Sequence, residues 1–215
     1  MEGFAAISGT VAWRGLSELG TAESYRPGEV LLHQGEPGDR VLLLLAGRVK
    51  VSLVDKAGNG ILLAIRGPGE VLGEIAMIDG QNRSATVSAM DVCDVRALPA
   101  ERFVTRLDEL GLRDELVKFT LGRLRESEAL CLELATLPAG PRIVRGLVRL
   151  AVPTVKGART VDIGLNQTEF GEAIGLSRAS VAGKLAELRD AGLVTTRRGR
   201  IIITDLPRLQ GLTGE

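Results

Sequence analysis

The chain has 215 residues, of which 45% are hydrophobic and 25% charged, and its 27 basic and 27 acidic residues give no net charge at neutral pH. This composition is typical of globular proteins and excludes a wholly disordered chain. Two cysteines and a single histidine are too few for a disulfide framework, a four-cysteine metal site or a histidine-rich metal site, and they argue against a histidine-based catalytic triad.

No segment of the sequence predicts export or membrane insertion. The longest aliphatic run, Val41–Ala46, is far shorter than the roughly 20 residues that span a bilayer. The first residues lack the basic and then apolar stretch of a secretory signal. We therefore expect a cytoplasmic protein with no membrane partner.

The two parts of the chain carry opposite charge. Residues 139–215 contain 12 Lys/Arg and 7 Asp/Glu, a net charge of +5, so residues 1–138 carry −5. A basic part favours contact with a polyanion such as nucleic acid, although an imbalance of this size also arises by chance. The positions of the basic residues therefore have to decide between the two.

Short apolar runs separated by turn residues dominate residues 22–98. Glycine- or proline-containing turns separate the runs, which are Val30–Leu32, Val41–Leu45, Val49–Val54 and Ile61–Ile65. Short strands at this spacing are typical of an antiparallel sandwich or barrel. We predict such a domain over residues 1–100.

Residues 73–85 hold a carboxylate and a guanidinium that could bind a nucleotide. Arg83 offers a planar fork of donors that suits a phosphodiester, and Glu74 can accept a hydrogen bond from a ribose 2′-hydroxyl. Gly73 and the small Ala76 leave backbone N–H groups accessible to an anion. By spacing alone, a structural Glu74–Arg83 ion pair is the simpler interpretation.

Residues 101–136 contain no proline and little glycine, and they predict one long helix. Every seventh residue supplies an apolar stripe, at Leu110, Val117, Leu124 and Cys131, and the complementary position holds Thr120, Ser127 and Leu134. A narrow stripe of this period is typical of a helix that pairs with another helix. We expect residues 101–138 to form a dimer interface through Val117, Leu124, Cys131 and Leu134; the alternative is that the stripe packs only on its own domain.

The segment Pro138–Pro141 breaks this helix and marks a domain boundary. Beyond it we predict an amphipathic helix over 142–152, a short strand over 160–165 and a helix over 167–174. Ser177 is a natural N-cap for a second helix over 178–190, after a turn that contains Gly175. Two strands, 193–196 and 201–204, then flank a basic turn. Residues 139–215 therefore predict a helix-turn-helix followed by a hairpin wing.

The basic residues of this last domain lie where a helix-turn-helix protein reads DNA. The start of the second helix presents Arg178, Ser180 and Lys184, and an arginine can form two hydrogen bonds with a guanine edge. The hairpin turn carries Arg197, Arg198 and Arg200, placed to contact phosphate, and the first helix adds Gln167 and Thr168. We predict that the domain binds double-stranded DNA, at a pseudo-palindromic site if the protein is a two-fold dimer.

From about Tyr25 to Asp205 the chain resembles transcription regulators of the CRP/FNR (catabolite activator) superfamily. Its segment Gly73-Glu74-x-Ala76-(x)6-Arg83-Ser84-Ala85 is similar to the phosphate cassette of cyclic-nucleotide-binding domains. The order of β-domain, long helix and winged helix-turn-helix is also similar to that of the family. The resemblance implies an α+β fold with a β-roll sensor domain, like a jelly roll. It also implies a homodimer formed through the long helix and a ligand that repositions the DNA-binding heads.

The resemblance also implies roles for single residues. It places a ribose contact at Glu74, phosphate or base contacts at Arg83 and Ser84, and backbone contacts at Gly73 and Ala76. On the long helix, Ser127 and Glu128 stand where the cAMP receptors of the family present Thr and Ser to the adenine. The implied effector is cAMP or another cyclic nucleotide, with no cofactor required, and a carboxylate at Glu128 suits guanine at least as well as adenine.

The DNA-reading helix departs from the family sequence Ser-Arg-Glu-Thr/Ser-Val-x-Arg. Ala179 stands in place of the glutamate and Gly183 in place of the second arginine. We expect a different or weaker DNA half-site, with Lys184 supplying part of the lost charge. RNA polymerase is a further candidate partner, through the basic loop 154–159.

The leading interpretation is a homodimeric DNA-binding regulator gated by a small ligand. A second interpretation keeps DNA binding and drops the ligand, and a third is a nucleotide-sensing protein whose heads contact another protein. An enzyme is not expected, because the sequence shows no nucleophile–base pair, metal cluster or P-loop. We expect His33 at the surface or a strand edge, and Cys93 and Cys131 as packing residues.

Overall fold

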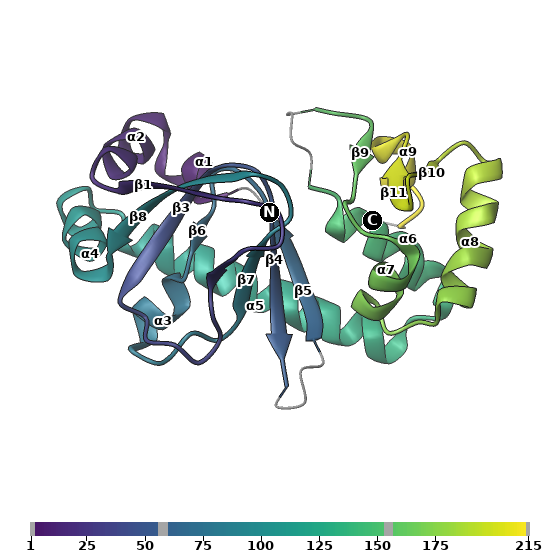
Figure 1. The fold of residues 1–215 in the computed structure, drawn as a ribbon, viewed down its shortest axis with the longest axis horizontal. Coiled ribbons are helices and arrows are strands. Elements are labelled where there is room, and N and C mark those ends of the chain that lie inside the picture. The colour runs from purple at the N-terminus through teal and green to yellow at the C-terminus, as the bar shows by residue number, and fades with distance from the viewer. Residues whose placement is uncertain (1–2, 56–59, 153–156, 214–215) are drawn as a thin grey trace. The chain divides into compact units, whose positions relative to one another are not determined.

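The computed structural model describes residues 3–55, 60–152 and 157–213 (Figure 1). Its contacts divide the chain into two compact units, Met1–Gly60 with Arg66–Ser127, and Ile61–Ile65 with Glu128–Glu215. The loop expected to face a polymerase, residues 154–159, falls partly outside the described residues. No described helix is long and apolar enough to cross a membrane.

Two four-stranded sheets form the β-domain, and all of their strands except most of β5 (Ile61–Ile65) belong to the first unit. One sheet has the order β1-β8-β3-β6 and consists of Thr21–Tyr25, Cys93–Pro99, Arg40–Ala46 and Val71–Leu72. The other has the order β2-β7-β4-β5 and consists of Val30–Leu32, Thr86–Ala89, Val49–Val54 and Gly60–Arg66. The described strand registers are antiparallel. The predicted antiparallel β-domain is confirmed.

The longest apolar run of the sequence is the central strand β3, which is buried on both faces. Leu42 and Leu44 point into a core shared with residues of the second sheet, such as Val49. Val41 and Leu43 point to the opposite face, where helices pack. Because side chains alternate along a strand, burial of both faces requires a continuous apolar sequence.

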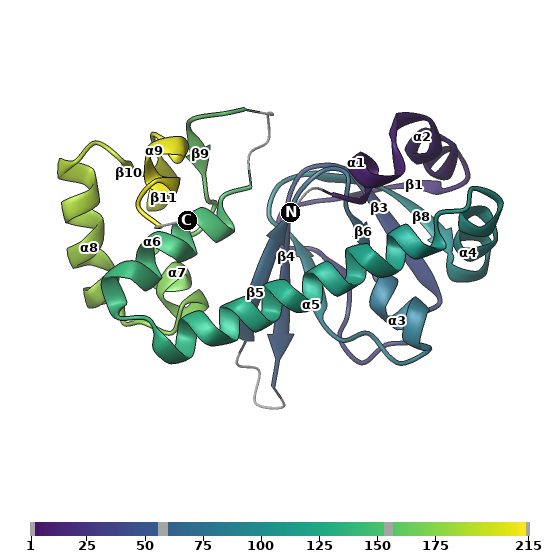
Figure 2. The same ribbon diagram turned by 180° about the vertical axis from the view of Figure 1, so that it is seen from behind.

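Helices cover the outer face of the sheet that contains β3. They are α1 (Phe4–Ser8), α2 (Thr10–Glu18), α4 (Ala100–Glu109) and the long α5 (Arg113–Thr136). Their shared core consists of Phe4, Leu16, Phe103, Leu107, Leu116 and Phe119. Figure 2 shows α5 running alongside the strands of this unit. The sequence analysis did not predict α1 and α2.

The prediction of one helix over residues 101–136 is wrong, because the segment forms two helices. The break after α4 is a glycine C-cap: Gly111 has a left-handed φ of 65°. The Leu112 N–H donates to the Leu107 carbonyl at 2.8 Å, and the Gly111 N–H donates to the Asp108 carbonyl at 3.0 Å. This pair of bonds is a Schellman motif, which satisfies the last carbonyls of a helix and turns the chain.

The second unit contains the expected winged helix-turn-helix. Its elements are α6 (Ala139–Leu150), β9 (Val161–Asp162), α7 (Gln167–Ala173), α8 (Arg178–Asp190), β10 (Val194–Arg197), β11 (Arg200–Ile203) and α9 (Leu206–Gln210). The strands form a sheet of order β10-β11-β9. Asn166 caps α7 in a capping box with Glu169, and the Ser177 hydroxyl accepts from the Ser180 N–H at the start of α8. The predicted strand over 160–165 is only two residues long, and α9 was not predicted.

The tight turn between α7 and α8 depends on a glycine inside α7. The Leu176 N–H donates to the Gly171 carbonyl at 2.9 Å. A β-carbon at Gly171 would lie 2.6 Å from the Leu176 carbonyl oxygen, closer than any normal contact. Gly175 adopts a left-handed φ of 64° in the turn itself. Two glycines therefore allow the helices to pack with Val181, Leu185 and Leu188 of α8 buried, as predicted.

Candidate functional site

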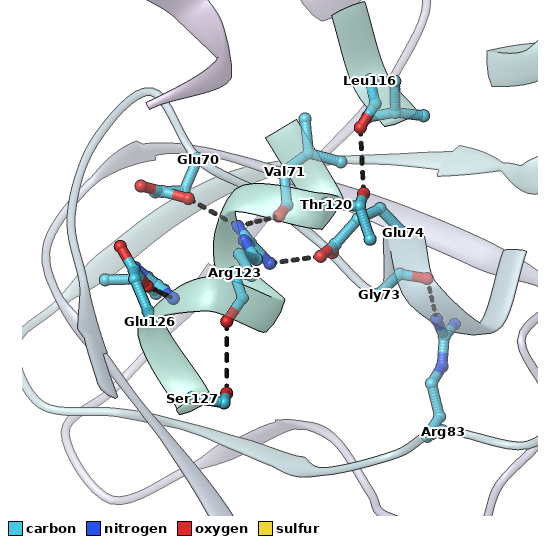
Figure 3. Close-up of polar contacts among 11 residues, drawn as sticks. Glu70, Val71, Gly73, Glu74, Arg83, Leu116, Thr120, Arg123, Glu126 and Ser127 are labelled. Atoms are coloured by element: carbon cyan, nitrogen blue, oxygen red, sulfur yellow. Dashed lines mark hydrogen bonds and ion pairs between the residues drawn. The ribbon is translucent and has the colours of Figure 1, made fainter. Parts of the chain in front are cut away.

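The five cassette residues that were assigned a ligand contact all line one recess of the first unit. The short helix α3 (Glu74–Asp79) begins after Gly73, whose φ of 86° is left-handed. The recess is lined by Gly73, Glu74, Ala76, Arg83 and Ser84, and by one residue of α5, Arg123. Figure 3 shows Arg83 approaching from one side and Arg123 from the other. The fold therefore brings the cassette together around a single cavity.

Glu74 is buried and already has a cationic partner. Its side chain is 1% exposed, and its carboxylate accepts a hydrogen bond from the Arg123 guanidinium. The same guanidinium donates to the Glu70 carboxylate at 2.5 Å and to the Val71 carbonyl at 2.8 Å. Two buried carboxylates thus share one arginine (Figure 3).

The alternative interpretation, a structural Glu74–Arg83 ion pair, is wrong. Arg83 donates instead to two backbone carbonyls, that of Gly73 at 2.9 Å and that of Arg40 at 2.5 Å. The nearest carboxylate oxygen in an ion pair with it belongs to the exposed Asp39, at 3.8 Å. Burial lowers the pKa of Arg83, while Asp39 raises it. An arginine nevertheless stays protonated in proteins, so the recess keeps a fixed positive charge, whose ion-pair partner Asp39 is exposed.

Arg123 is a charged residue of the site that was not predicted from the sequence. Burial by itself lowers the pKa of Arg123, but the neighbouring Glu74 and Glu70 carboxylates raise it above its usual value, so the side chain stays charged. Its guanidinium also lies over the Phe119 ring, 4.5 Å from the centroid. The residue lies at helical spacing from the buried Leu116 and Leu130, and a charge on that face was the signal available in the sequence.

The two α5 residues expected to contact a base lie outside this lining. Ser127 is exposed, and its hydroxyl donates to the Arg123 carbonyl one helical turn earlier, at 3.2 Å. Glu128 is exposed at the next position. Their roles remain predictions.

The exposed stripe of α5 differs in detail from the predicted one. Val117, Leu121 and Leu124 are 45%, 51% and 55% exposed, and Cys131 is also exposed. Their spacing of four, three and seven residues is the a/d period of a coiled coil, and it places Glu128 on the same stripe. Leu121 was not predicted, and Leu134 is half-buried rather than exposed. The opposite face of α5, with Leu116, Phe119 and Leu130, packs within the chain.

The predicted DNA-reading side chains gather on α8 and the wing. Arg178 and Ser180 are exposed at the start of α8, whereas the half-buried Lys184 pairs with Glu187 at 2.6 Å. The wing is a two-residue hairpin turn in which Arg198 and Gly199 have φ of 49° and 79°. Arg197 and Arg198 are exposed, and Arg200 lies 3.5 Å from Asp162. Gln167 and Thr168 form the first turn of α7.

The remaining predictions concern the histidine and the cysteines. His33 is exposed, as expected, and Cys93 is buried in β8, where burial raises the pKa of its thiol. Cys131 is exposed rather than packed within the chain, and both thiols are free. Among the described residues, no group of three or more His, Cys, Asp and Glu side chains could hold a metal ion.

Comparison with known proteins agrees with both halves of this description. Residues 22–109 match the model of the cyclic nucleotide-binding domain, and residues 141–212 match that of the Crp-like helix-turn-helix domain. A CRP-like cAMP-activated global transcriptional regulator of Mycobacterium tuberculosis is 29% identical over 85% of this chain and 83% of its own length. A global nitrogen regulator of Synechococcus elongatus is 29% identical over 84% of each chain.

Solved structures show the same fold. FixK2 from Bradyrhizobium japonicum has a TM-score of 0.74 and 24% identity over 90% of this chain and 96% of its own. A CRP/FNR-family transcriptional regulator of Thermus thermophilus has a TM-score of 0.66 and 26% identity over 91% of this chain and 99% of its own. Because its two domains match the cyclic nucleotide-binding and Crp-like helix-turn-helix models, the chain belongs to the CRP/FNR family of transcription regulators.

Proposed function

We propose that the protein is a homodimeric transcription regulator whose affinity for DNA is set by a cyclic nucleotide bound in the β-roll. The observation that carries the proposal is that a guanidinium and a carboxylate, with separate partners, both line the same recess. Arg83 offers a buried guanidinium to a phosphodiester, and Glu74 offers a buried carboxylate to a ribose hydroxyl. Relatives named as cAMP-activated regulators support this class of effector.

Arg123 connects this recess to the helix expected to form the dimer. Its guanidinium donates a hydrogen bond to the buried Glu74 carboxylate and so holds that carboxylate in one orientation. A ligand that bonds to Glu74 therefore acts on a group tied directly to α5. By preferring one setting of α5, the ligand would shift the population of dimers towards the arrangement that binds DNA.

We assign DNA binding to α8 and the wing. The exposed Arg178 and Ser180 at the start of α8 are placed to reach base edges, and Arg197 and Arg198 on the wing are placed to reach phosphate. Two such heads in a two-fold dimer would read a pseudo-palindromic site with half-sites about 34–36 Å apart. RNA polymerase remains a proposed further partner.

Calorimetric titration of nucleotide-free protein with cAMP and with cGMP tests the effector. Replacing Arg83 with alanine should weaken binding at least about 30-fold, because it removes a buried charged partner of the phosphate. The affinity of Arg83→Lys should lie between those of the wild type and Arg83→Ala, because lysine keeps the positive charge but loses the planar set of hydrogen-bond donors. Arg14→Ala is the control, because Arg14 is an exposed arginine of α2 outside the recess lining.

The nucleotide preference tests Glu128. A preference for cGMP that Glu128→Gln abolishes would support contact of this carboxylate with guanine. Absence of heat with both nucleotides, in protein that binds DNA, would instead support the effector-independent regulator, in which the Arg123 cluster serves only the fold.

A further inference from the structure

Phe4, the first residue of the N-terminal helix α1, packs on the same aromatic ring that supports Arg123. Phe4 is fully buried, and its ring meets that of Phe119 edge to face, with centroids 5.6 Å apart and planes at 61°. The Arg123 guanidinium in turn lies 4.5 Å from the Phe119 centroid. Phe4, Phe119 and Arg123 thus form a continuous chain of contacts from α1 to the recess.

The Phe119 ring matters to Arg123 because the hydrogen bonds of Arg123 involve only the two terminal nitrogens of its guanidinium. The two terminal nitrogens donate to Glu74, Glu70 and Val71. The Nε atom is buried and has no hydrogen-bond partner within the described structure. Its position therefore depends on stacking against Phe119, a contact that suits the weakly hydrated guanidinium.

Helix α1 also contacts the loop that carries one of the two carboxylates. The Ala5 N–H donates to the Gly69 carbonyl at 2.9 Å, and Gly69 directly precedes Glu70. A β-carbon at Gly3 would lie 2.8 Å from the same carbonyl oxygen, so the chain passes too closely for a larger residue. Helix α1 therefore contacts both the Phe119 ring, which lies against Arg123, and the loop that precedes Glu70.

We propose that Phe4 is a positioning residue for Arg123, through which the N-terminal helix α1 sets the affinity of the recess for its effector. Phe4 itself touches no ligand. It fixes the Phe119 ring, the ring fixes the guanidinium, and the guanidinium fixes the Glu74 carboxylate. The proposal rests on the assignment of the recess as a cyclic-nucleotide site.

The test compares Phe4→Leu with Leu16→Ala. Phe4→Leu keeps an apolar side chain and removes the ring, whereas Leu16 is equally buried in the same core, on α2. Phe4→Leu should weaken binding of the nucleotide that the wild type prefers by roughly 2- to 10-fold, the worth of an aromatic pair. Leu16→Ala should lower the thermal midpoint yet leave the nucleotide affinity unchanged. Equal losses of affinity in the two variants would overturn the proposal.

A double-mutant cycle shows whether the effect passes through Arg123. In an Arg123→Gln background, Phe4→Leu should cause no further change of affinity, because the group that it positions is gone. If Phe4→Leu weakened nucleotide binding by the same factor in that background, its effect would not pass through Arg123 and the proposal would be refuted.

A ligand-free readout separates this inference from the effector assignment. The Arg123 Nε–H resonance, identified by its loss in Arg123→Gln, should be shifted by the Phe119 ring current. Phe4→Leu should move it, and Leu16→Ala should leave it in place. If the wild type bound no nucleotide but Phe4→Leu still moved this resonance, the effector assignment would be rejected and the positioning of Arg123 by Phe4 would stand. An unmoved resonance would reject that positioning.

Discussion

At the scale of single residues, the site is organised by an arginine on α5 rather than by the two charged residues of the cassette. Glu74 and Arg83 are predictable from their spacing and residue types, because a carboxylate and a guanidinium in a glycine-flanked segment suit a sugar phosphate. Their partners are not predictable in this way. Glu74 pairs with Arg123, which is 49 residues away, and Arg83 with backbone carbonyls. The first contact depends on how α5 packs against the cassette, and the second on the path of the backbone at Gly73 and Arg40.

Arg123→Gln should destabilise the protein by about 3–5 kcal/mol, because it leaves the buried Glu70 and Glu74 carboxylates without a charged partner. Chemical denaturation measures the change in unfolding free energy. Arg125→Gln, at an exposed position of the same helix, is the control and should change it by less than about 0.5 kcal/mol. Similar stability of the two variants would show that the cluster contributes nothing to folding.

At the scale of elements, the sequence predicts the helices and strands best where local signals are strong. The caps at Asn166 and Ser177 and the glycine turn between them place α7 and α8 within about a residue of their observed ends. The break at Gly111 was missed because a glycine within a heptad pattern is compatible with a continuous helix. Its Schellman bonds became evident only from the backbone.

Two glycines should respond to alanine with opposite sign. Gly183 lies within α8, and an added β-carbon would meet no atom within 4 Å, so Gly183→Ala should stabilise the protein by about 0.5–1 kcal/mol. Gly111 is equally open but has a φ of 65°, so Gly111→Ala should destabilise it by about 1–2 kcal/mol. Thermal unfolding of both variants checks the pair, and a shift of the same sign in both would contradict the conformational argument.

The exposed stripe of α5 gives a prediction for assembly. Leu124→Glu should convert the dimer to a monomer in sedimentation velocity, because it places a charge on an apolar a/d position. Ala129→Glu introduces the same charge on an exposed residue off the stripe and should remain dimeric. Dissociation by both variants, or by neither, would show that the stripe is not the dimer contact.

The same helix offers a covalent probe of this contact. If Cys131 lies on the two-fold seam, mild oxidation should link two chains through it, while the buried Cys93 stays unreacted. Serine at Cys131 is the control and should abolish the covalent dimer on a non-reducing gel. If the wild type sediments as a dimer but runs as a monomer on the gel, Cys131 does not lie at the dimer contact.

At the scale of the whole molecule, the sequence predicts the domain order and the family, and its local detail decides the function. The short strands, the long helical segment and the capped helix pair appear in the order that the fold requires. What it leaves open is the identity of the proposed effector and the DNA sequence that is read. Both depend on departures from the family pattern, Glu128 on α5 and Ala179 and Gly183 on α8.

The central claim is that occupation of the recess controls DNA binding. Fluorescence anisotropy with a duplex selected from random DNA measures the DNA affinity with and without saturating cAMP or cGMP, for the wild type and for Arg83→Ala. We predict that one nucleotide tightens DNA binding of the wild type by roughly 5- to 150-fold, the usual range of allosteric coupling, and leaves Arg83→Ala unchanged. Equal DNA affinity of the wild type with and without either nucleotide would contradict the account.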